Sequence, residues 1–217
     1  DTPGDPLTLQ VRIHNYSDVW VPTVGRSTAV HFDGERAIKL GESFFYNHAS
    51  GTGVTLQHLH EGDTYELSAV VPQRPSEAQI ADAGAGSVKQ PKAQRVPETL
   101  RTLSRQWTEG APTAGAQALA IEKQLQLGYF SHGQEDEVPS QPGHSQSRLL
   151  ALLDDPKRMI GDGEQYATTM ALMARELGIP SRVIYGFEVE GSSQITGEQV
   201  GAWAELNLEG LGWVRFN

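Results

Sequence analysis

Apolar and polar residues alternate in short runs within the first third of the chain. Two of these runs place an apolar residue at every second position: Leu7, Leu9, Val11 and Ile13, then Tyr65, Leu67, Ala69 and Val71. A period of two is typical of half-buried strands, because successive side chains point to opposite faces. Turn residues at 15–18 and 61–63 separate the runs. The pattern predicts a small antiparallel sheet or sandwich in a β-rich N-terminal segment, residues 1–72.

Residues 73–95 have a different composition. They are rich in Pro, Ala, Gly, Ser, Lys and Gln and contain almost no large apolar side chains. A segment of this kind contributes little to a hydrophobic core and is typical of linkers. We therefore predict a linker or mobile loop here.

From residue 96 onward the apolar spacing becomes that of helices. One stripe is formed by Val96, Leu100, Leu103 and Trp107, and a second by Ala118, Ile121 and Leu125. A long polar loop at 128–147 precedes a short predicted helix near 148–153. The clearest helix spans residues 163–177, with one apolar face formed by Tyr166, Met170, Met173, Ala174 and Leu177.

The ends of this helix also follow known rules. Asp162 is a suitable N-cap, and Gln165 three residues later completes a capping box. Gly178 and Pro180 end the helix. Alternation then predicts strands at 183–189, 200–208 and 212–216. We expect an α+β fold, with residues 96–217 forming a domain of helices packed on an antiparallel sheet.

Composition and charge restrict the class of protein. The chain of 217 residues is 38% hydrophobic and 20% charged, as in soluble globular domains. It contains no cysteine, which excludes disulfides, thiolate metal sites and a thiol nucleophile. The net charge of -10 repels phosphate backbones, so no nucleic-acid partner is expected. The sequence begins with Asp1, so we interpret it as a mature chain or a fragment of a longer protein.

Four sequence motifs in the second half resemble the core of bacterial transglutaminase-like proteins, which have a papain-like fold. Residues 161–167 read GDGEQYA, 171–183 read ALMARELGIPSRV, 201–206 read GAWAEL, and 210–217 read GLGWVRFN. The family pattern is G-x-C-E-x-[FY]-A at a helix start, then L-G-I-P-A-R-V, H-A-W-x-E on a strand and G-W-x-x-F-D on the next. The resemblance covers residues 96–217, with the last motif truncated at Asn217. It implies a papain-like core preceded by a β-rich segment, as in large membrane-anchored members.

The resemblance also implies a catalytic triad, and this sequence lacks all three members. In the family, a thiolate at the helix N-terminus pairs with a histidine that an aspartate orients, which allows acyl-enzyme chemistry. Here the three positions are Gly163, Gly201 and Asn217. Glycine can neither attack a carbonyl nor transfer a proton. We therefore interpret the domain as a pseudoenzyme, and expect Gly163 in the first helical turn with Gly201 on a neighbouring strand, within roughly 10 Å of it.

Several other residues are candidates for a role in the inherited groove. Asp162 and Glu164 form a carboxylate pair that could do acid–base work, although helix capping is the simpler interpretation. His132 and His144 lie in the polar loop and could form a wall or lid over the cleft. Trp203 and Trp213 could line a groove, although aromatic residues at alternating strand positions more often belong to the core.

A functional and a simpler interpretation can also be given for Gly201 and for a pair of histidines. A glycine at position 201 allows the close approach of a ligand to the strand, or it is a neutral relic of the lost histidine. His58 and His60 form an H-x-H pair that could bind zinc together with further ligands, for which His31 and His48 are possible. Surface polar residues are the simpler interpretation. The sequence predicts no cofactor and no metal site.

Three hypotheses on function follow. The first is a non-catalytic interaction module on the extracytoplasmic face of a bacterial cell membrane. It would bind a protein, a peptide or a cell-wall component. The second is an enzyme with a relocated, non-cysteine site, such as a hydrolase that uses His144 or the carboxylates of Asp162 and Glu164. The third is a purely structural module. The location and the membrane anchoring of the parent protein are implied by the resemblance alone.

Overall fold

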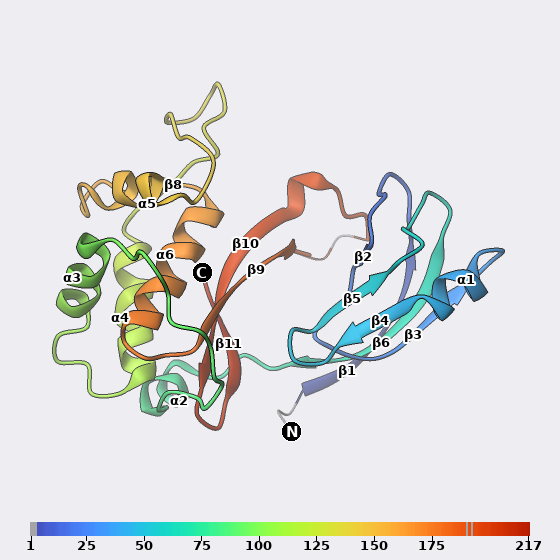
Figure 1. Cartoon of the computed structure of the whole chain (residues 1–217), viewed down its shortest axis with the longest axis horizontal. Coiled ribbons are helices and arrows are strands. Elements are labelled where there is room, and N and C mark those ends of the chain that lie inside the picture. The colour runs from blue at the N-terminus through green and yellow to red at the C-terminus, as the bar shows by residue number, and fades with distance from the viewer. Residues whose placement is uncertain (1–3, 190, 192) are drawn as a thin grey trace. The chain divides into compact units, whose positions relative to one another are not determined.

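The computed structural model describes residues 4–189, 191 and 193–217, and the chain folds as two compact units. Unit 1 comprises Asp1–Gln73 and unit 2 comprises Arg74–Asn217. Both combine helices with antiparallel strands, which confirms the α+β class (Figure 1). Each unit has its own hydrophobic core.

Unit 1 is built from two three-stranded antiparallel sheets. The first has the order β1-β6-β3 and the second the order β2-β5-β4. Their bounds are β1 Gly4–Arg12, β2 Trp20–Val21, β3 Arg26–Asp33, β4 Phe44–Asn47, β5 Thr52–Thr55 and β6 Thr64–Pro72, with one short helix, α1, at Ala37–Glu42. The expected alternation is confirmed in the central strand β6, where Tyr65, Leu67 and Ala69 are buried. In β1, at the edge of the sheet, the apolar residues are only half-buried or exposed.

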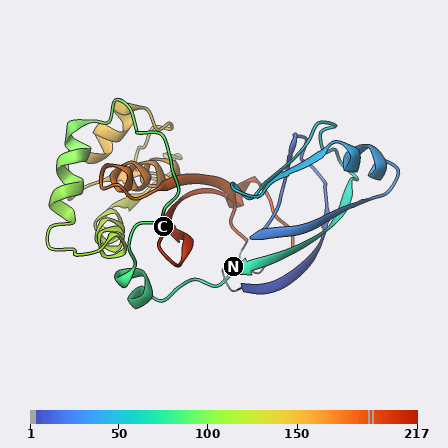
Figure 2. The same ribbon diagram turned by 60° about the horizontal axis from the view of Figure 1, so that its bottom comes forward.

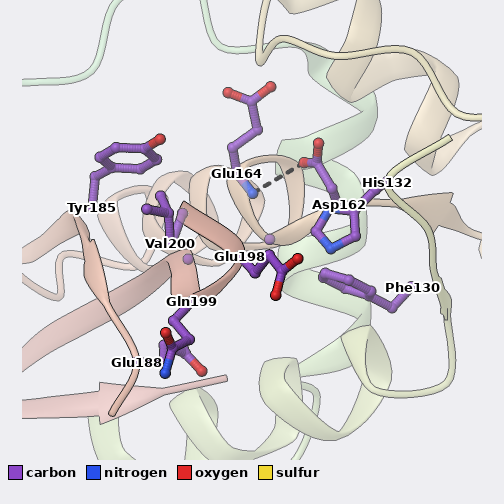
Figure 3. Close-up of a pocket in the computed structure, with 12 residues that line it drawn as sticks. Phe130, His132, Asp162, Glu164, Tyr185, Glu188, Glu198, Gln199 and Val200 are labelled. Carbon is purple, nitrogen blue, oxygen red and sulfur yellow. Dashed lines mark hydrogen bonds between the residues drawn. The ribbon is translucent and has the colours of Figure 1, made fainter. Parts of the chain in front are cut away.

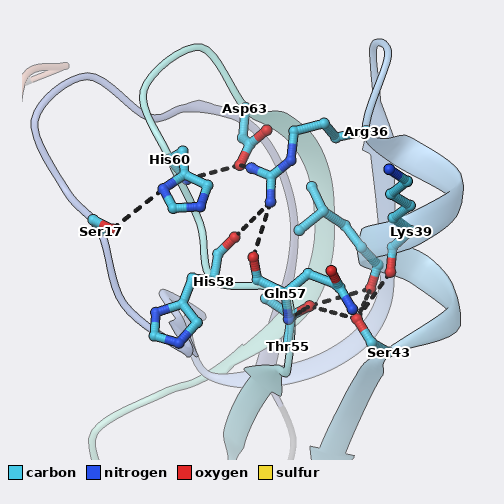
Figure 4. A network of polar contacts seen from close by, with 10 residues as sticks. Ser17, Arg36, Lys39, Ser43, Thr55, Gln57, His58, His60 and Asp63 are labelled. Atoms are coloured by element: carbon cyan, nitrogen blue, oxygen red, sulfur yellow. Dashed lines mark hydrogen bonds and ion pairs between the residues drawn. The ribbon is translucent and has the colours of Figure 1, made fainter.

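A buried carboxylate joins the loops of unit 1 (Figure 4). Asp63 forms an ion pair with Arg36 at 2.5 Å and accepts the backbone N–H of His60 at 2.8 Å. The guanidinium of Arg36 also donates to the carbonyl oxygens of Gln57 and His58, at 2.9 and 3.0 Å. The loop that carries both histidines is thus fixed by an ion pair. No group of three or more potential metal ligands is found among the described residues.

In unit 2, helices α6 and α4 contact a three-stranded antiparallel sheet of order β11-β10-β9, and α3 and α5 pack against α6 (Figures 1 and 2). The helices are α3 Glu98–Trp107, α4 Ala114–Leu125, α5 Gln146–Leu153 and α6 Gly163–Glu176. The strands are β9 Ser181–Phe187, β10 Val200–Leu208 and β11 Gly212–Phe216. Unit 2 also contains a short parallel pair, β7 Tyr129–Phe130 and β8 Ile160–Gly161, and a 3-10 turn, η1 Gly197–Gln199.

The core of unit 2 lies between α6 and the sheet. Its buried members from α6 include Met170, Met173 and Ala174, and those from the strands include Ala204, Leu206, Leu208, Val214 and Phe216. The predicted helix is confirmed almost to the residue. It begins at Gly163, directly after Asp162, whose side chain accepts the backbone N–H groups of Glu164 and Gln165 at 3.1 and 3.3 Å.

The segment predicted as a linker or mobile loop differs from that expectation, because residues 74–95 belong to unit 2. They contain α2, Glu77–Asp82, which begins with a capping box at Ser76. Ile80 of this helix is 1% exposed and lies in the core. Apart from Ile80 and Ala83, the segment is attached through backbone hydrogen bonds, such as that from the N–H of Gly86 to the carbonyl of Asn207 at 2.9 Å, so it needs few large apolar residues. It was this shortage that suggested a linker.

One glycine makes this packing possible. A Cβ atom at Gly115, in the first turn of α4, would lie only 1.6 Å from the carbonyl oxygen of Ile80. The amide of Gly115 donates to the carbonyl of Ala83 at 2.9 Å. The two helices are therefore in backbone contact, which any side chain at this position would prevent.

We expect Gly115→Ala to destabilise the protein by about 1–3 kcal/mol, because the new methyl group overlaps the backbone of α2. Alanine normally stabilises a helix relative to glycine, so the sign itself is informative. Gly41→Ala in α1 is the matched control, since its Cβ would meet nothing within 4 Å. Urea unfolding of both variants measures the difference. A Gly115→Ala protein as stable as the parent would show that α2 is not packed on α4.

Candidate functional site

An open cleft lies in unit 2 where the start of α6 approaches the start of β10 (Figure 3). Its volume is about 520 Å³. Its walls come from the β7 end, the first turn of α6, the end of β9 and the start of β10. The lining residues are Phe130, His132, Asp162, Gly163, Glu164, Tyr185, Glu188, Glu198, Gln199, Val200, Gly201 and Ala202.

The two glycines lie together in this cleft, as predicted. Gly163 is the first residue of α6 and Gly201 is the second residue of β10. A Cβ atom at Gly163 would lie 3.1 Å from the carbonyl oxygen of Ala202 and 3.5 Å from its nitrogen. Since Ala202 is bonded to Gly201, the expected proximity of the two positions is confirmed.

A carboxylate covers the position where a histidine side chain would begin. A Cβ atom at Gly201 would lie 3.1 Å from Oε1 of Glu188. Arg215 holds this carboxylate at 2.5 Å, and its Nε donates to Oδ1 of Asn217 at 2.7 Å. Positions 201 and 217 are therefore linked by a continuous Glu–Arg–Asn chain. Nothing in the sequence pattern pointed to Glu188, because it belongs to none of the motifs; it lies just after the end of β9.

Asn217 is also fixed by its backbone. Its N–H donates to Oε1 of Glu122 at 3.0 Å, and its carbonyl accepts from the amide of Gln126 at 3.1 Å. Burial raises the pKa of the Glu122 carboxyl above its ordinary value. Side chains of α4 thus anchor the end of β11.

The cleft is acidic. Four carboxylates line it, and no lysine or arginine is among the described lining residues; the four are Asp162, Glu164, Glu188 and Glu198. Three of them also have structural partners: Asp162 caps α6, Glu164 contacts His144, and Glu188 pairs with Arg215. Glu198 is exposed. At neutral pH the walls therefore favour cationic or neutral groups over anions.

His144 does not line the cleft, although it is connected to it. Its Nδ1 lies 3.2 Å from Oε2 of Glu164, and the imidazole is mostly exposed. The other carboxylate oxygen of Glu164 accepts the backbone N–H of Gly143. Both oxygens of Glu164 therefore hold the polar loop against the start of α6.

Gln165 gives this loop its second attachment. Its side chain is fully buried, and the amide donates to the carbonyl oxygens of Gln141 and Gly143 at 2.7 and 2.9 Å. Its own oxygen accepts the N–H of Asp162 at 3.2 Å. One buried side chain thus completes the capping box and fixes the loop.

The other side of the cleft is formed by the last residue of β7 and a residue shortly after it. Phe130 and His132 pack edge to face with ring centroids 4.8 Å apart. Glu137 fixes the backbone of His132 by accepting its N–H at 2.6 Å. Tyr166 of α6 donates to the carbonyl of Tyr129 at 3.1 Å, and burial raises the pKa of Tyr166 to about 12. His132 is therefore in the wall of the cleft, where the sequence placed it as one alternative.

Trp203 is not among the lining residues of the cleft. It lies half-buried outside the core cluster, with the guanidinium of Arg215 4.3 Å from its ring centroid. Trp213 is covered in the same way by Arg182 at 4.2 Å. The alternation that suggested core or groove positions places both rings on the sheet surface opposite α6, where arginine side chains cover them.

A family model for the transglutaminase-like superfamily matches residues 101–217, more than half of the chain. The chain belongs to the transglutaminase-like superfamily. A search of curated proteins found no match.

The fold is also similar to two crystal structures of the periplasmic domain of TgpA from Pseudomonas aeruginosa, one of them bound to ethylmercury. Both align with a TM-score of 0.66 and 16% identity. The alignments cover all of this chain and 70% and 73% of the TgpA chains. At this identity the likeness establishes the fold of this superfamily member, including both of its units.

We expect Gln165→Ala to lower the free energy of unfolding by about 1–3 kcal/mol, because it leaves a void and several unpaired polar groups. Backbone amides in residues 139–145 should exchange hydrogen faster in the same variant. Gln106→Ala, at an exposed position of α3, is the matched control and should change stability by less than about 0.5 kcal/mol. Unchanged exchange in the loop would contradict its attachment through Gln165.

Proposed function

We propose that this superfamily member is a pseudoenzyme that binds a segment of protein or peptide in the inherited cleft. The observation that carries the proposal is the composition of the cleft. The three triad positions hold Gly163, Gly201 and Asn217, and no serine, threonine, cysteine or lysine is among the described lining residues. Acyl transfer requires a nucleophile next to a base. The cleft provides an imidazole, carboxylates and the phenol of Tyr185, and no hydrogen bond joins this phenol to a base among the described residues.

The alternative of a relocated hydrolytic site has less support. His144 is engaged with Glu164 outside the cleft, and the nearby hydroxyls of Ser145 and Ser147 contact each other at 3.0 Å. The carboxylate of Asp162 is used in capping α6. These side chains have structural partners that account for their positions, and none is paired as a nucleophile with its base.

The shape of the site supports binding. The cleft remains open although its catalytic groups are gone, and its carboxylates favour a neutral or basic partner. Papain-like clefts hold chain segments, which is why a peptide or protein is the partner in this proposal.

The proposed location is the extracytoplasmic side of a bacterial membrane, because the similar TgpA structures are described as a periplasmic domain. No helix among the described residues has the length and apolarity needed to cross a bilayer. In this proposal, membrane anchoring belongs to other segments of the parent protein.

We expect no transamidation and no amide hydrolysis when the purified protein is incubated with a glutamine-containing peptide and a fluorescent amine. Product should form no faster than in buffer, because no thiol faces the cleft and its one hydroxyl among the described lining residues, the phenol of Tyr185, is not paired with a base. Mass spectrometry of the peptide gives the readout. Turnover that disappears in His132→Ala or His144→Ala would refute the pseudoenzyme proposal and support a relocated site.

We expect a random-peptide display selection against the protein to enrich neutral or basic peptides, because the cleft walls are acidic. Glu198→Lys should lower the affinity of the protein for the enriched peptides about tenfold, which corresponds to about 1.4 kcal/mol of binding free energy. Glu135→Lys, an equal charge change at an exposed position outside the cleft, is the matched control. Failure to enrich any peptide, or equal effects of the two substitutions, would contradict binding in the cleft.

A further inference from the structure

Strand β9 is an edge strand that ends at the cleft. It pairs with β10 from Ser181↔Leu206 to Phe187↔Val200 without a register shift. In the sheet order β11-β10-β9, no other described strand lies on its far side. Tyr185 of β9, and Glu188 just after it, line the cleft (Figure 3).

The hydrogen bonds at the two ends of the β9–β10 pair show which residues face outward. The N–H of Asn207 donates to the carbonyl of Pro180, and the N–H of Glu188 donates to the carbonyl of Gln199, each at 2.7 Å. Since hydrogen-bonded positions alternate in an antiparallel pair, residues 180, 182, 184, 186 and 188 bond to β10. The backbone groups of Ser181, Val183, Tyr185 and Phe187 therefore point away from the sheet.

The first of these outward positions confirms the alternation and is already satisfied. The N–H of Ser181 donates to Oε1 of Gln90 at 2.8 Å, and its carbonyl accepts from Arg175 at 2.9 Å. No described residue supplies a corresponding partner to the outward groups of Val183, Tyr185 or Phe187. Three consecutive outward positions, with one donor and one acceptor each, are thus available to an extended chain.

The outer edge of β9 lacks the features that usually prevent edge strands from pairing with another chain. Residues 183–187 read VIYGF, with no proline and no charge, and the pairing contains no bulge. The side chains of Val183 and Tyr185 are 42% and 77% exposed. They lie on the same face of the strand, as alternate residues do, and add apolar contact surface beside the free backbone groups.

We propose that β9 binds an extended, basic segment of another protein as the fourth strand of this sheet, with lysine or arginine side chains reaching the cleft carboxylates. The backbone of the segment pairs with Val183, Tyr185 and Phe187, and its alternate apolar side chains contact Val183 and Tyr185. Its cationic residue lies where β9 ends, near Glu188 and Glu198. The inference rests on the proposed function and specifies how the partner binds.

Charge favours this occupant over a second copy of the same chain. Residues 96–217 carry a net charge of -7, with 16 acidic and 9 basic residues. Pairing β9 with β9 of another molecule would bring together two units that each carry this negative net charge, and like charges oppose such an association. A basic segment neutralises the cleft instead.

The test uses the peptides enriched by display selection on the intact protein. Val183→Pro removes one outward N–H and leaves the bonds to β10 in place, because proline is tolerated on edge strands when its nitrogen faces solvent. We expect Val183→Pro to lower the affinity for the best peptide more than about tenfold. Val183→Thr, which keeps the β-branched shape and the N–H, is the matched control and should bind nearly as the parent does.

A second measurement does not depend on the variant folding. The best peptide is resynthesised in two versions, with N-methyl groups on its odd-numbered residues in one and on its even-numbered residues in the other. One version should lose binding and the other should keep it, since only alternate amides of an added strand face β9. Enriched peptides should also combine lysine or arginine with alternating apolar residues.

Three other experimental outcomes would each lead to a different conclusion. If Glu198→Lys lowers peptide affinity but Val183→Pro and N-methylation do not, strand addition is overturned and binding in the cleft still stands. Failure to enrich any peptide would contradict both proposals. Dimerisation in sedimentation experiments, abolished by Val183→Pro, would identify a second copy as the occupant and overturn the inference.

Discussion

The packing of α6 on β10 is the constraint on which the site depends. Small side chains such as Ala174 and Ala204 are fully buried between the helix and the strand, so the two backbones approach closely. This contact brings the first turn of α6 to Ala202, and with it Gly163 to Gly201. Neither the caps nor the apolar faces of these elements involve the catalytic chemistry of the family. The geometry of the site is therefore retained without its reactive groups.

The elements that could be predicted from sequence are those that local rules determine. Helix α6 has a complete capping box and a regular apolar stripe, and the motifs that follow it gave the order of the strands. The adjacency of Gly163 and Gly201 followed from the resemblance, because members of the family need contact between these positions. For these elements, capping residues, apolar spacing and the order of the motifs along the chain were sufficient for the prediction.

What could not be predicted depends on contacts between distant segments. Helix α2 was missed because its attachment uses a glycine in α4 and one isoleucine, a pattern that resembles a linker in sequence. The position of Glu188 over Gly201 depends on the register of β9 against β10 and on Arg215 from a third strand. Trp203 was assigned to core or groove because alternation does not show that an arginine covers the outer face of the sheet.

The ion pair between Glu188 and Arg215 also affects how the family triad could be installed at this site. The triad requires three substitutions, at Gly163, Gly201 and Asn217. An imidazole restored at position 201 would meet a carboxylate that already occupies the adjacent space and is held by a guanidinium. A histidine at position 201 alone therefore perturbs an established contact. In terms of protein design, installing the family triad here favours a fourth change, at Glu188 or Arg215, so that the imidazole and this ion pair do not compete for the same space.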